Sequence, residues 1–215
     1  AKLARKFGIS KEEQDDWSIN SHSNALKSRQ ILRSEITPIL NQTNDLFTRK
    51  LSKKICEKAP KLSDTVTHAN SAIAADAAGF VVLVSELFFK NKMCKGVEVL
   101  GSGTSGIIPE ETPLAPVGAI QALLDQTKIC LSKVAFIELM EAYAAQAIMC
   151  TRLCNLDLDK INIRGGALSR GHPIGASGAI LVVRLFNELI KKPETFGMAA
   201  IAAAGGIGSA MMLKS

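Results

Sequence analysis

The feature that most constrains the fold is a regular alternation of strand-like and helix-like segments through the second half of the chain. Short apolar runs typical of buried strands are followed by longer amphipathic stretches typical of helices. Because the apolar runs are nearly continuous, the strands need cover on both faces. The sequence therefore predicts an α/β sandwich in which helices cover a sheet. The expected strands are 97–100, 134–139, 198–203 and 207–213, and the expected helices are 114–128, 141–154 and 175–190.

Two earlier regions give weaker local signals. The first forty residues read as helical, and Ser10 with Glu13 has the spacing of a capping box that opens a helix. Residues 72–85 are rich in Ala and Val and contain one acid, Asp76. We expect this stretch to form a buried helix that closes into an apolar segment.

The composition fits a folded protein with an aliphatic core. Hydrophobic residues make up 47% and charged residues 21% of the chain, which argues against disorder. Aromatic residues are only 5%, so Ala, Val, Leu and Ile must fill the core. In the helix expected at 175–190, Arg184 and Glu188 are expected on the solvent side.

The positive charge is concentrated in one segment. The chain carries 26 basic and 20 acidic residues, a net charge of +6, and residues 41–61 hold +4 of it. A nucleic-acid or phosphate-binding patch is one interpretation, and a solvated loop face is the other. Interleaved aromatic residues, which support single-stranded nucleic-acid binding, are missing apart from Phe47, so we expect no nucleic-acid partner.

No segment has the pattern of a membrane span or a secretion signal. Residues 1–16 are charged throughout. The longest uncharged run, 197–213, is short for a bilayer span and is interrupted by glycines. The five cysteines form no C-x-x-C pair, so a zinc ribbon is excluded and no metal site is expected. We interpret them as buried thiols of a cytoplasmic protein.

Three glycine-rich places are candidates for chemistry. Gly101 to Gly106 matches G-x-G-x-x-G, but Pro109, Pro113 and Pro116 prevent a helix from starting there. A dinucleotide-binding turn needs that helix, so we interpret this stretch as a flexible loop after a strand.

The second glycine-rich place, residues 162–178, contains a histidine. His172 lies between Gly171 and Pro173, on a tight turn that precedes a helix. A histidine held there is a candidate base or hydrogen-bond donor. The third place is 202–210, where small residues turn between two expected strands, and backbone N–H groups at such a turn can stabilise an oxyanion.

Taken together, these segments resemble the thiolase family of acyl-CoA-condensing and acyl-CoA-cleaving enzymes. Residues 162–178 are similar to the family's N-x-x-G-G-A-x-x-x-G-H-P-x-G-A-S-G pattern, and 202–210 to its C-A-A-G-G-x-G-x-A pattern. Residues 140–146 resemble its N-E-A-F-A-A-Q box, and residues 7–15, 21–22 and 65–70 resemble further family stretches. The resemblance spans essentially the whole chain and is closest to the 3-ketoacyl-CoA thiolases of fatty-acid β-oxidation.

The resemblance implies a domain organisation. The family chain is roughly twice as long and stacks two similar α-β-α halves. On this basis, residues 1–62 are the helical remnant of a loop domain that covers coenzyme A, and 63–94 are the tail of the amino-terminal half. Residues 95–215 are the carboxy-terminal thiolase domain. The segment that carries the family's nucleophilic cysteine is not in this sequence.

The resemblance also implies roles for particular residues. His172 stands at the position of the histidine that activates the nucleophilic thiolate. Ala202 replaces a second cysteine, which moves the proton on and off the acetyl carbon, and a methyl group transfers no proton. Met140 replaces the Asn or His that positions a water near the enolate oxygen. The N–H of Ala204, beside Gly205, stays available for an oxyanion hole.

The substrate and partner follow from the same resemblance. Coenzyme A is expected as a substrate and no cofactor is expected. In the segment that contacts coenzyme A, the family's small polar residues and glycines have become Ala72, Ile73 and Ala77. We expect the isolated chain to have no thiolase turnover. It is expected to be part of a thiolase-type acyltransferase, and the alternative is a non-catalytic subunit that binds acyl-CoA or a thiolase chain. The expected partner is an amino-terminal thiolase half or further copies in a homo-oligomer.

Overall fold

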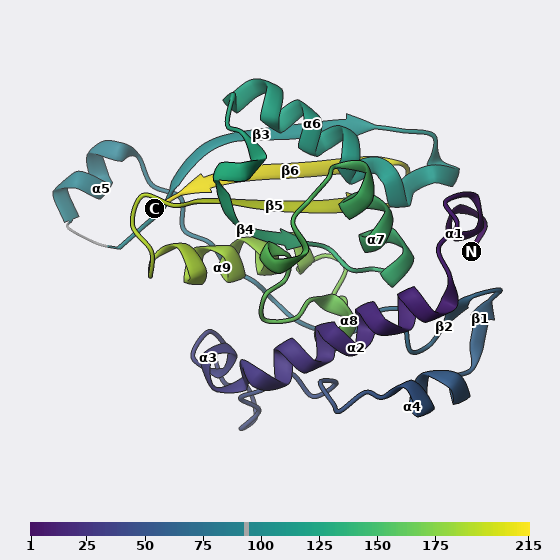
Figure 1. Ribbon diagram of the computed structural model, residues 1–215. Helices are drawn as coiled ribbons and strands as arrows, with labels where there is room; N and C mark the ends of the chain where they lie inside the picture. The colour runs from purple at the N-terminus through teal and green to yellow at the C-terminus, as the bar shows by residue number, and fades with distance from the viewer. Residues whose placement is uncertain (93–94) are drawn as a thin grey trace.

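A four-stranded mixed sheet forms the centre of the computed structural model, which describes residues 1–92 and 95–215 (Figure 1). The strand order is β3-β6-β5-β4, with β4 parallel to β5 and the other pairs antiparallel. Parallel pairing places the carboxyl ends of β4 and β5 at the same edge of the sheet. The strands are β3 (Glu98–Gly106), β4 (Val134–Leu139), β5 (Phe196–Ala203) and β6 (Ile207–Lys214).

Helices cover both faces of this sheet, as predicted. On one face, α6 (Ala115–Thr127) and α7 (Ala144–Leu153) pack with the strands around Ile120, Cys150 and Met198. On the other face, Leu181, Leu185 and Leu189 of α9 (Ser177–Leu189) pack against the strands. The α/β sandwich is therefore confirmed, with a core that is almost entirely aliphatic.

The glycine-rich stretch 101–106 is a strand, so its interpretation as a flexible loop was wrong. It belongs to β3 and pairs with β6 along its whole length. The glycines permit close helix packing, because a Cβ built on Gly103 would lie 2.2 Å from the carbonyl oxygen of Ala119 in α6. Glycine here reflects the approach of a helix to the sheet.

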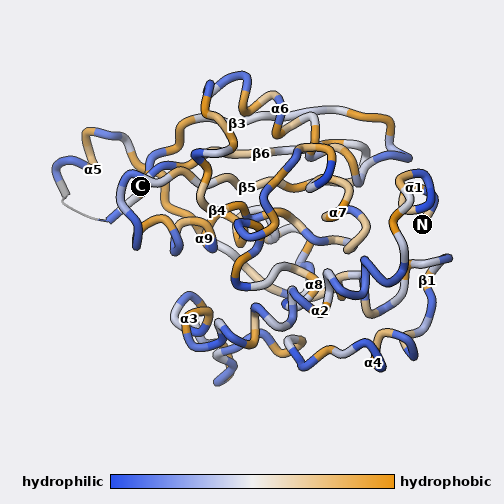
Figure 2. The backbone as a smooth tube through the Cα atoms, in the orientation of Figure 1, coloured by the Kyte–Doolittle hydropathy of each residue, from blue (hydrophilic) through white to orange (hydrophobic). Residues whose placement is uncertain are grey.

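The amino-terminal region is helical and more hydrophilic than the sheet layers (Figure 2). Ser10 and Glu13 form the expected capping box at the start of the long helix α2. The basic side chains of 50–61 are exposed, and Lys53 pairs with Glu12 and Asp16 of α2. The elements are α1 (Lys2–Lys6), α2 (Lys11–Lys27), α3 (Arg29–Arg33), α4 (Lys53–Lys58), β1 (Lys61–Ser63) and β2 (Val66–Thr67).

Residues 72–85 form no helix and no regular strand, so the prediction of a buried helix was wrong. Isolated bridges, such as Ala74 with His172, tie the start of this stretch to the rest of the fold. From Phe80 onward the side chains are exposed, and α5 (Glu86–Lys92) follows. An apolar composition predicts burial, but these side chains lie at the surface and form no regular element, which the composition alone did not reveal.

Arg184 and Glu188 are buried, so their expected solvent exposure was also wrong. Arg184 pairs with Glu35, next to α3, and with Glu188 and Glu138. Glu188 also binds Arg164 through both carboxylate oxygens. The amino-terminal region covers this side of α9, and the charged side chains are therefore paired inside the protein.

The remaining described elements are short helical turns. The short turns are η1 (Pro109–Leu114), η2 (Leu131–Lys133), η3 (Leu158–Lys160) and α8 (Ala167–Arg170). Within the described residues, no helix is long and apolar enough to cross a membrane.

The domain boundaries implied by the resemblance stay predictions.

Candidate active site

His172 lies on a tight turn between α8 and α9, as the sequence predicted. Its backbone N–H donates a 2.7 Å hydrogen bond to the carbonyl of Ile73. The preceding Gly171 has a φ of 99°, and a Cβ there would lie 2.8 Å from the Cβ of Ala75. Glycine is therefore required on two grounds, positive φ and close contact. The turn is held firmly against residues 73–75.

The imidazole of His172 is oriented by Ser177, a residue that sequence analysis did not single out. The Ser177 hydroxyl donates to the carbonyl of Pro173 at 3.0 Å, and its oxygen lies 2.7 Å from His172 Nδ1. With its proton used toward Pro173, this hydroxyl accepts from Nδ1–H. The tautomer inferred from these bonds leaves the Nε2 lone pair free. Partial burial lowers the pKa of His172, so the ring is neutral near pH 7 and can accept a proton.

The second part of the candidate site is the hairpin between β5 and β6. It confirms the turn predicted at 202–210. Ala202 pairs with Gly208, and Ala203 with Ile207. Ala204 and Gly205 are exposed at the tip. Gly206 has a φ of 87°, and a Cβ there would lie 2.0 Å from the carbonyl oxygen of Ile107. This close approach lets the Ile107 N–H bind the Gly206 carbonyl at 2.8 Å, which fixes the hairpin.

Met140 follows β4 directly and is buried. Its side chain packs with the apolar cluster under α9, which also contacts Ala72. The Met140 N–H donates to the carbonyl of Ala200 at 2.9 Å. At this position the protein offers a thioether in an apolar layer and no strong hydrogen-bond donor.

A series of backbone hydrogen bonds brings the segments that carry the predicted site residues together. His172 binds Ile73, the adjacent Ala72 donates to Ala142 at 3.0 Å, and Met140 donates to Ala200. Ala200 in turn precedes Ala202 in β5. These segments therefore meet at the carboxyl ends of β4 and β5, where open α/β sheets commonly bind ligands.

Glu141 is the second residue that the sequence analysis missed. It belongs to the hydrogen-bond network that holds the site segments together. Its carboxylate is 1% exposed and accepts hydrogen bonds from Trp17 Nε1 at 3.0 Å and Ser21 Oγ at 2.8 Å. Asn162 Nδ2, at 2.7 Å, and the Leu168 N–H, at 3.3 Å, also donate to it. An acid two residues after a buried strand was the available signal. The network fastens α2 to the segment that leads into the His172 turn.

An open groove of about 510 Å³ lies beside His172. Its walls are residues 75–79 on one side and Pro173 to Ala176 with Ala179 on the other. Apart from Asp76, the side chains lining it are small or apolar. The groove is large enough for a ligand or for side chains of another polypeptide segment.

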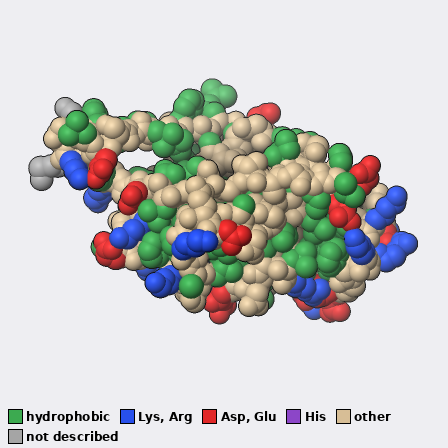
Figure 3. All heavy atoms as spheres, turned by 90° about the horizontal axis from the view of Figure 1, so that it is seen from above, with side chains coloured by type: hydrophobic (Ala, Val, Ile, Leu, Met, Phe, Trp, Pro, Cys, Tyr) green, Lys and Arg blue, Asp and Glu red, His purple; other side chains and the backbone are tan. Residues whose placement is uncertain are grey.

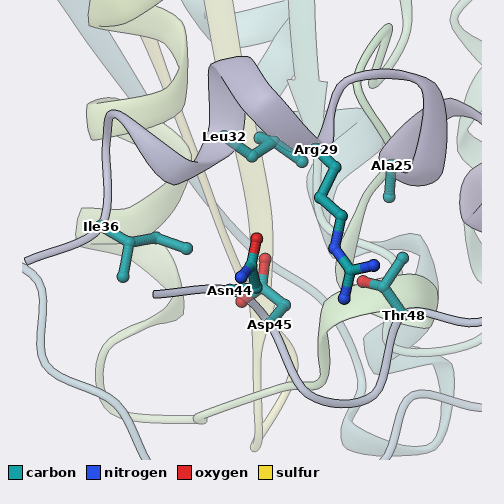
Figure 4. Close-up of a pocket in the computed structure, with 7 residues that line it drawn as sticks. All are labelled: Ala25, Arg29, Leu32, Ile36, Asn44, Asp45 and Thr48. Atoms are coloured by element: carbon teal, nitrogen blue, oxygen red, sulfur yellow. The ribbon is translucent and has the colours of Figure 1, made fainter. Parts of the chain in front are cut away.

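A second cavity, between α2, α3 and the loop at 44–48, is too small for a substrate (Figure 4). It holds about 10 Å³, roughly the space of one water molecule. Arg29 reaches toward Thr48 across it, and burial raises the pKa of Asp45 while Arg170 and Arg184 oppose that rise.

Three of the described cysteines do not provide a reactive thiolate. Burial raises the pKa of Cys56 to about 11, of Cys150 to about 12 and of Cys154 to about 11. These three thiols are therefore protonated at neutral pH and are poor nucleophiles. Cys130 is exposed, against the expectation of a buried thiol, and Cys94 lies outside the described residues.

Comparison with known proteins identifies the family. The profile described as "Thiolase, C-terminal domain" matches residues 95–215. The chain is 35% identical over 221 residues to the putative acetyl-CoA C-acetyltransferase YhfS of Bacillus subtilis, covering 98% of this chain and 61% of that protein. It is 36% identical over 222 residues to a probable acetyl-CoA acyltransferase of Staphylococcus aureus, covering 95% of this chain and 56% of that protein.

Solved structures give the same result. Human mitochondrial 3-ketoacyl-CoA thiolase superposes with a TM-score of 0.90 at 27% identity, over 100% of this chain and 58% of that one. A thiolase from Ascaris suum in complex with coenzyme A superposes with a TM-score of 0.89 at 28% identity, over 100% and 58% of the two chains. The chain thus spans somewhat less than two thirds of the length of these proteins. It belongs to the thiolase family.

Proposed function

We propose that this chain is the base-bearing part of a thiolase-type acyltransferase of acyl-CoA metabolism. The observation that carries the proposal is the geometry of His172, whose Nε2 lone pair is left free by the bond between Nδ1 and Ser177. A neutral histidine of this kind takes a proton from a thiol nucleophile or from coenzyme A. The names of the curated relatives support acetyl-CoA or a 3-ketoacyl-CoA as the substrate.

The proposed reaction is thiolysis of a 3-ketoacyl-CoA or its reverse. A thiolate adds to the 3-keto carbon, the bond between C2 and C3 breaks, and C2 takes up the proton that the thiol released, to give acetyl-CoA. The acyl group stays on the enzyme thiol until the thiolate of coenzyme A accepts it. His172 accepts the thiol proton, and the N–H groups of Ala204 and Gly205 face the developing oxyanion. Ala72 and its neighbours line the coenzyme A path, and no other cofactor takes part.

Ala202 and Met140 favour a second candidate, a non-catalytic subunit that binds acyl-CoA. Neither side chain moves a proton or holds a water at the enolate oxygen. Three of the described thiols are protonated at neutral pH, so the chain supplies no activated nucleophile from these residues. We therefore propose that the chain binds coenzyme A without turnover by itself. A cytoplasmic location, a role in β-oxidation and an oligomeric state belong to the same proposal.

Calorimetric titration with coenzyme A and with acetyl-CoA tests this function. We expect saturable binding of both, retained in His172→Ala, because the proposed base contributes to proton transfer more than to binding. The matched probe is a single-stranded oligonucleotide, which is expected to bind weakly and only at low salt, since contacts to phosphates alone are screened. No binding of either CoA compound at millimolar concentration, or salt-sensitive binding of the oligonucleotide alone, contradicts the proposal.

A further inference from the structure

Residues 27–50, here called the α3 segment, comprise the end of α2, the short helix α3 and a loop that returns past it. Figure 1 shows α3 at the edge of the molecule, below the sheet. Leu32 of α3 and Thr48 of the loop line the same small cavity, so the helix and the returning loop lie side by side (Figure 4). The Arg49 N–H donates to His22 Nδ1 of α2 at 3.3 Å. The α3 segment is therefore one continuous part of the surface.

The outward-facing charge of the α3 segment is positive. Lys27, Arg33 and Lys50 are exposed, and none of them forms an ion pair within the described residues. The two acids of the segment face inward. The Glu35 side chain is 4% exposed and pairs with an arginine of α9, and Asp45 lines the small cavity.

Other parts of the surface differ in this respect. On the face drawn in Figure 3, acidic and basic side chains lie close together along much of the rim. Interspersed charges of both signs are typical of a solvated surface. A segment whose outward charges all have one sign attracts a partner of the opposite sign.

The α3 segment also exposes large aliphatic side chains at a tight turn. Residues 39–42 form a small hairpin in which Ile39 and Gln42 exchange two backbone hydrogen bonds. Leu40 at the tip is 89% exposed, Ile39 is 70% exposed, and Leu46 after the hairpin is 80% exposed. Exposure of several large aliphatic side chains on one short segment is unfavourable in water and marks an interaction surface.

Local folding does not account for the leucine at the hairpin tip. Leu40 has a φ of 49° and Asn41 a φ of 66°, so both lie in the left-handed region. Two-residue turns of this kind favour Asn and Gly. Asn41 follows that preference and Leu40 does not. The backbone and the solvent both disfavour leucine here, which points to a partner that accepts an apolar side chain.

A basic surface with aliphatic tips fits anionic lipid better than nucleic acid. Single-stranded nucleic acid binds by stacking its bases on aromatic rings. Phe47 is the only aromatic residue of the segment, and its ring is already in contact with other groups. The Arg49 guanidinium lies 4.1 Å from its centroid and the His22 ring 5.7 Å. Leucine and isoleucine instead enter the acyl region of a bilayer, while lysine and arginine meet anionic headgroups.

We propose that the α3 segment docks the protein onto the surface of an anionic lipid bilayer. The three aliphatic side chains at and after the hairpin enter the boundary between headgroups and acyl chains. The three exposed basic side chains lie at the level of the lipid phosphates. Docking is peripheral and reversible, because so few side chains give far less affinity than a spanning helix. The inference goes beyond the proposed acyltransferase function and holds whether or not the chain has turnover.

Co-flotation of the full chain with lipid vesicles tests the proposal. The vesicles contain phosphatidylcholine alone or phosphatidylcholine with phosphatidylglycerol. We expect binding to the anionic vesicles to be at least about tenfold stronger, since each basic side chain near the surface adds attraction. Sodium chloride and sodium phosphate of equal ionic strength are expected to weaken it equally, because screening lowers the attraction and no single phosphate site is involved.

Two sets of variants separate the apolar and the charged contributions. Leu40→Ser is expected to weaken binding to anionic vesicles by about tenfold, since it removes the apolar tip. Leu158→Ser, which alters a 63% exposed leucine in η3, is the matched control and should bind like the parent. The double variant Lys27→Gln, Arg33→Gln is expected to lose about tenfold on anionic vesicles and nothing on phosphatidylcholine. Fluorescence of the single tryptophan, Trp17, reports that each variant is folded.

The proposal is overturned if the chain floats with neither kind of vesicle at millimolar lipid, or if Leu40→Ser binds as well as the parent. Binding of an oligonucleotide that the charge variant loses, without vesicle binding, would assign the surface to nucleic acid. A dimer that dissociates in Leu40→Ser, again without vesicle binding, would assign it to a second copy of the chain. Vesicle binding without binding of coenzyme A leaves this inference intact and contradicts only the proposed function.

Discussion

The two main parts of the candidate site differ in what they retain. In the His172 turn both backbone and side chains are in place, since Ser177 orients the imidazole and Ile73 fixes its peptide. In the hairpin after β5 the backbone is in place, with Gly206 held by Ile107, but the side chain at 202 is a methyl group. The difference teaches that the backbone frame of a candidate site and the side chains it presents are determined by separate interactions. Tight glycine packing preserves the frame whatever side chain stands at position 202.

The largest expected effect comes from breaking the frame behind the His172 turn. Glu141→Ala leaves the buried donors of Trp17, Ser21 and Asn162 without their acceptor, so we expect the free energy of unfolding to fall by about 4 kcal/mol. Urea denaturation measures this loss. The exposed Glu110→Ala is the matched control and is expected to change stability by less than about 0.5 kcal/mol. A similar, small effect of both variants would mean that the network does not hold the turn.

The hairpin is tested by a pair of neighbouring glycines. Both have positive φ, but only the Cβ of Gly206→Ala collides with the Ile107 carbonyl oxygen, at 2.0 Å. We expect a loss of about 3 kcal/mol for Gly206→Ala and about 1 kcal/mol for Gly205→Ala, where φ alone is unfavourable. Thermal unfolding of the two variants measures the difference. Equal losses would show that the contact with Ile107 does not define the hairpin.

A smaller effect is expected from removing the hydroxyl that orients His172. Ser177→Ala deletes the partner of Nδ1 and is expected to cost about 1 kcal/mol of stability. The diagnostic reading is the imidazole ¹⁵N spectrum, which should change from one tautomer to a mixture of two. Ser209→Ala, an exposed serine on β6, should leave the spectrum as it was. An unchanged tautomer in Ser177→Ala would remove Ser177 from the site.

The smallest expected effect is the pH dependence that His172 contributes to stability. Burial lowers its pKa in the folded protein below the usual value of 6.5, so the unfolded chain takes up a proton first as pH falls. The contribution of His172 is therefore complete above about pH 6.5 and is lost as the pH decreases toward the folded pKa. Comparing the pH–stability profiles of the parent and His172→Gln isolates it. A parent that gains stability relative to the variant on acidification contradicts the assignment.

The sequence predicted those elements whose signal is local. The strand predicted at 134–139 matches β4, and Ser10 with Glu13 forms the predicted capping box at the start of α2. Both signals act over a few residues, through apolar periodicity and cap chemistry. The stretch 72–85 and the charged residues of α9 were predicted wrongly. Their environment is set by tertiary contacts, in which Arg184 meets Glu35 across 149 positions of sequence.

The same reasoning predicted the turn at His172 and the hairpin after β5, since glycine and proline determine turns locally. It missed Ser177 and Glu141 as functional partners. Ser177 acts through an imidazole five residues away, and Glu141 accepts from Trp17 and Ser21, more than a hundred residues earlier in the chain. Such roles follow from the folded geometry and have no distinct pattern in the sequence.

The central proposal is that His172 is the base of a thiolase site whose backbone frame is in place, and that Cys56, Cys150, Cys154, Ala202 and Met140 supply neither an activated nucleophile nor a second proton carrier. Thiolysis of acetoacetyl-CoA by coenzyme A, measured at high concentration of the isolated chain, tests it most directly. We predict no turnover that depends on His172, since loss of catalytic groups lowers rates by orders of magnitude. Turnover by the isolated chain that disappears in His172→Ala would contradict the claim.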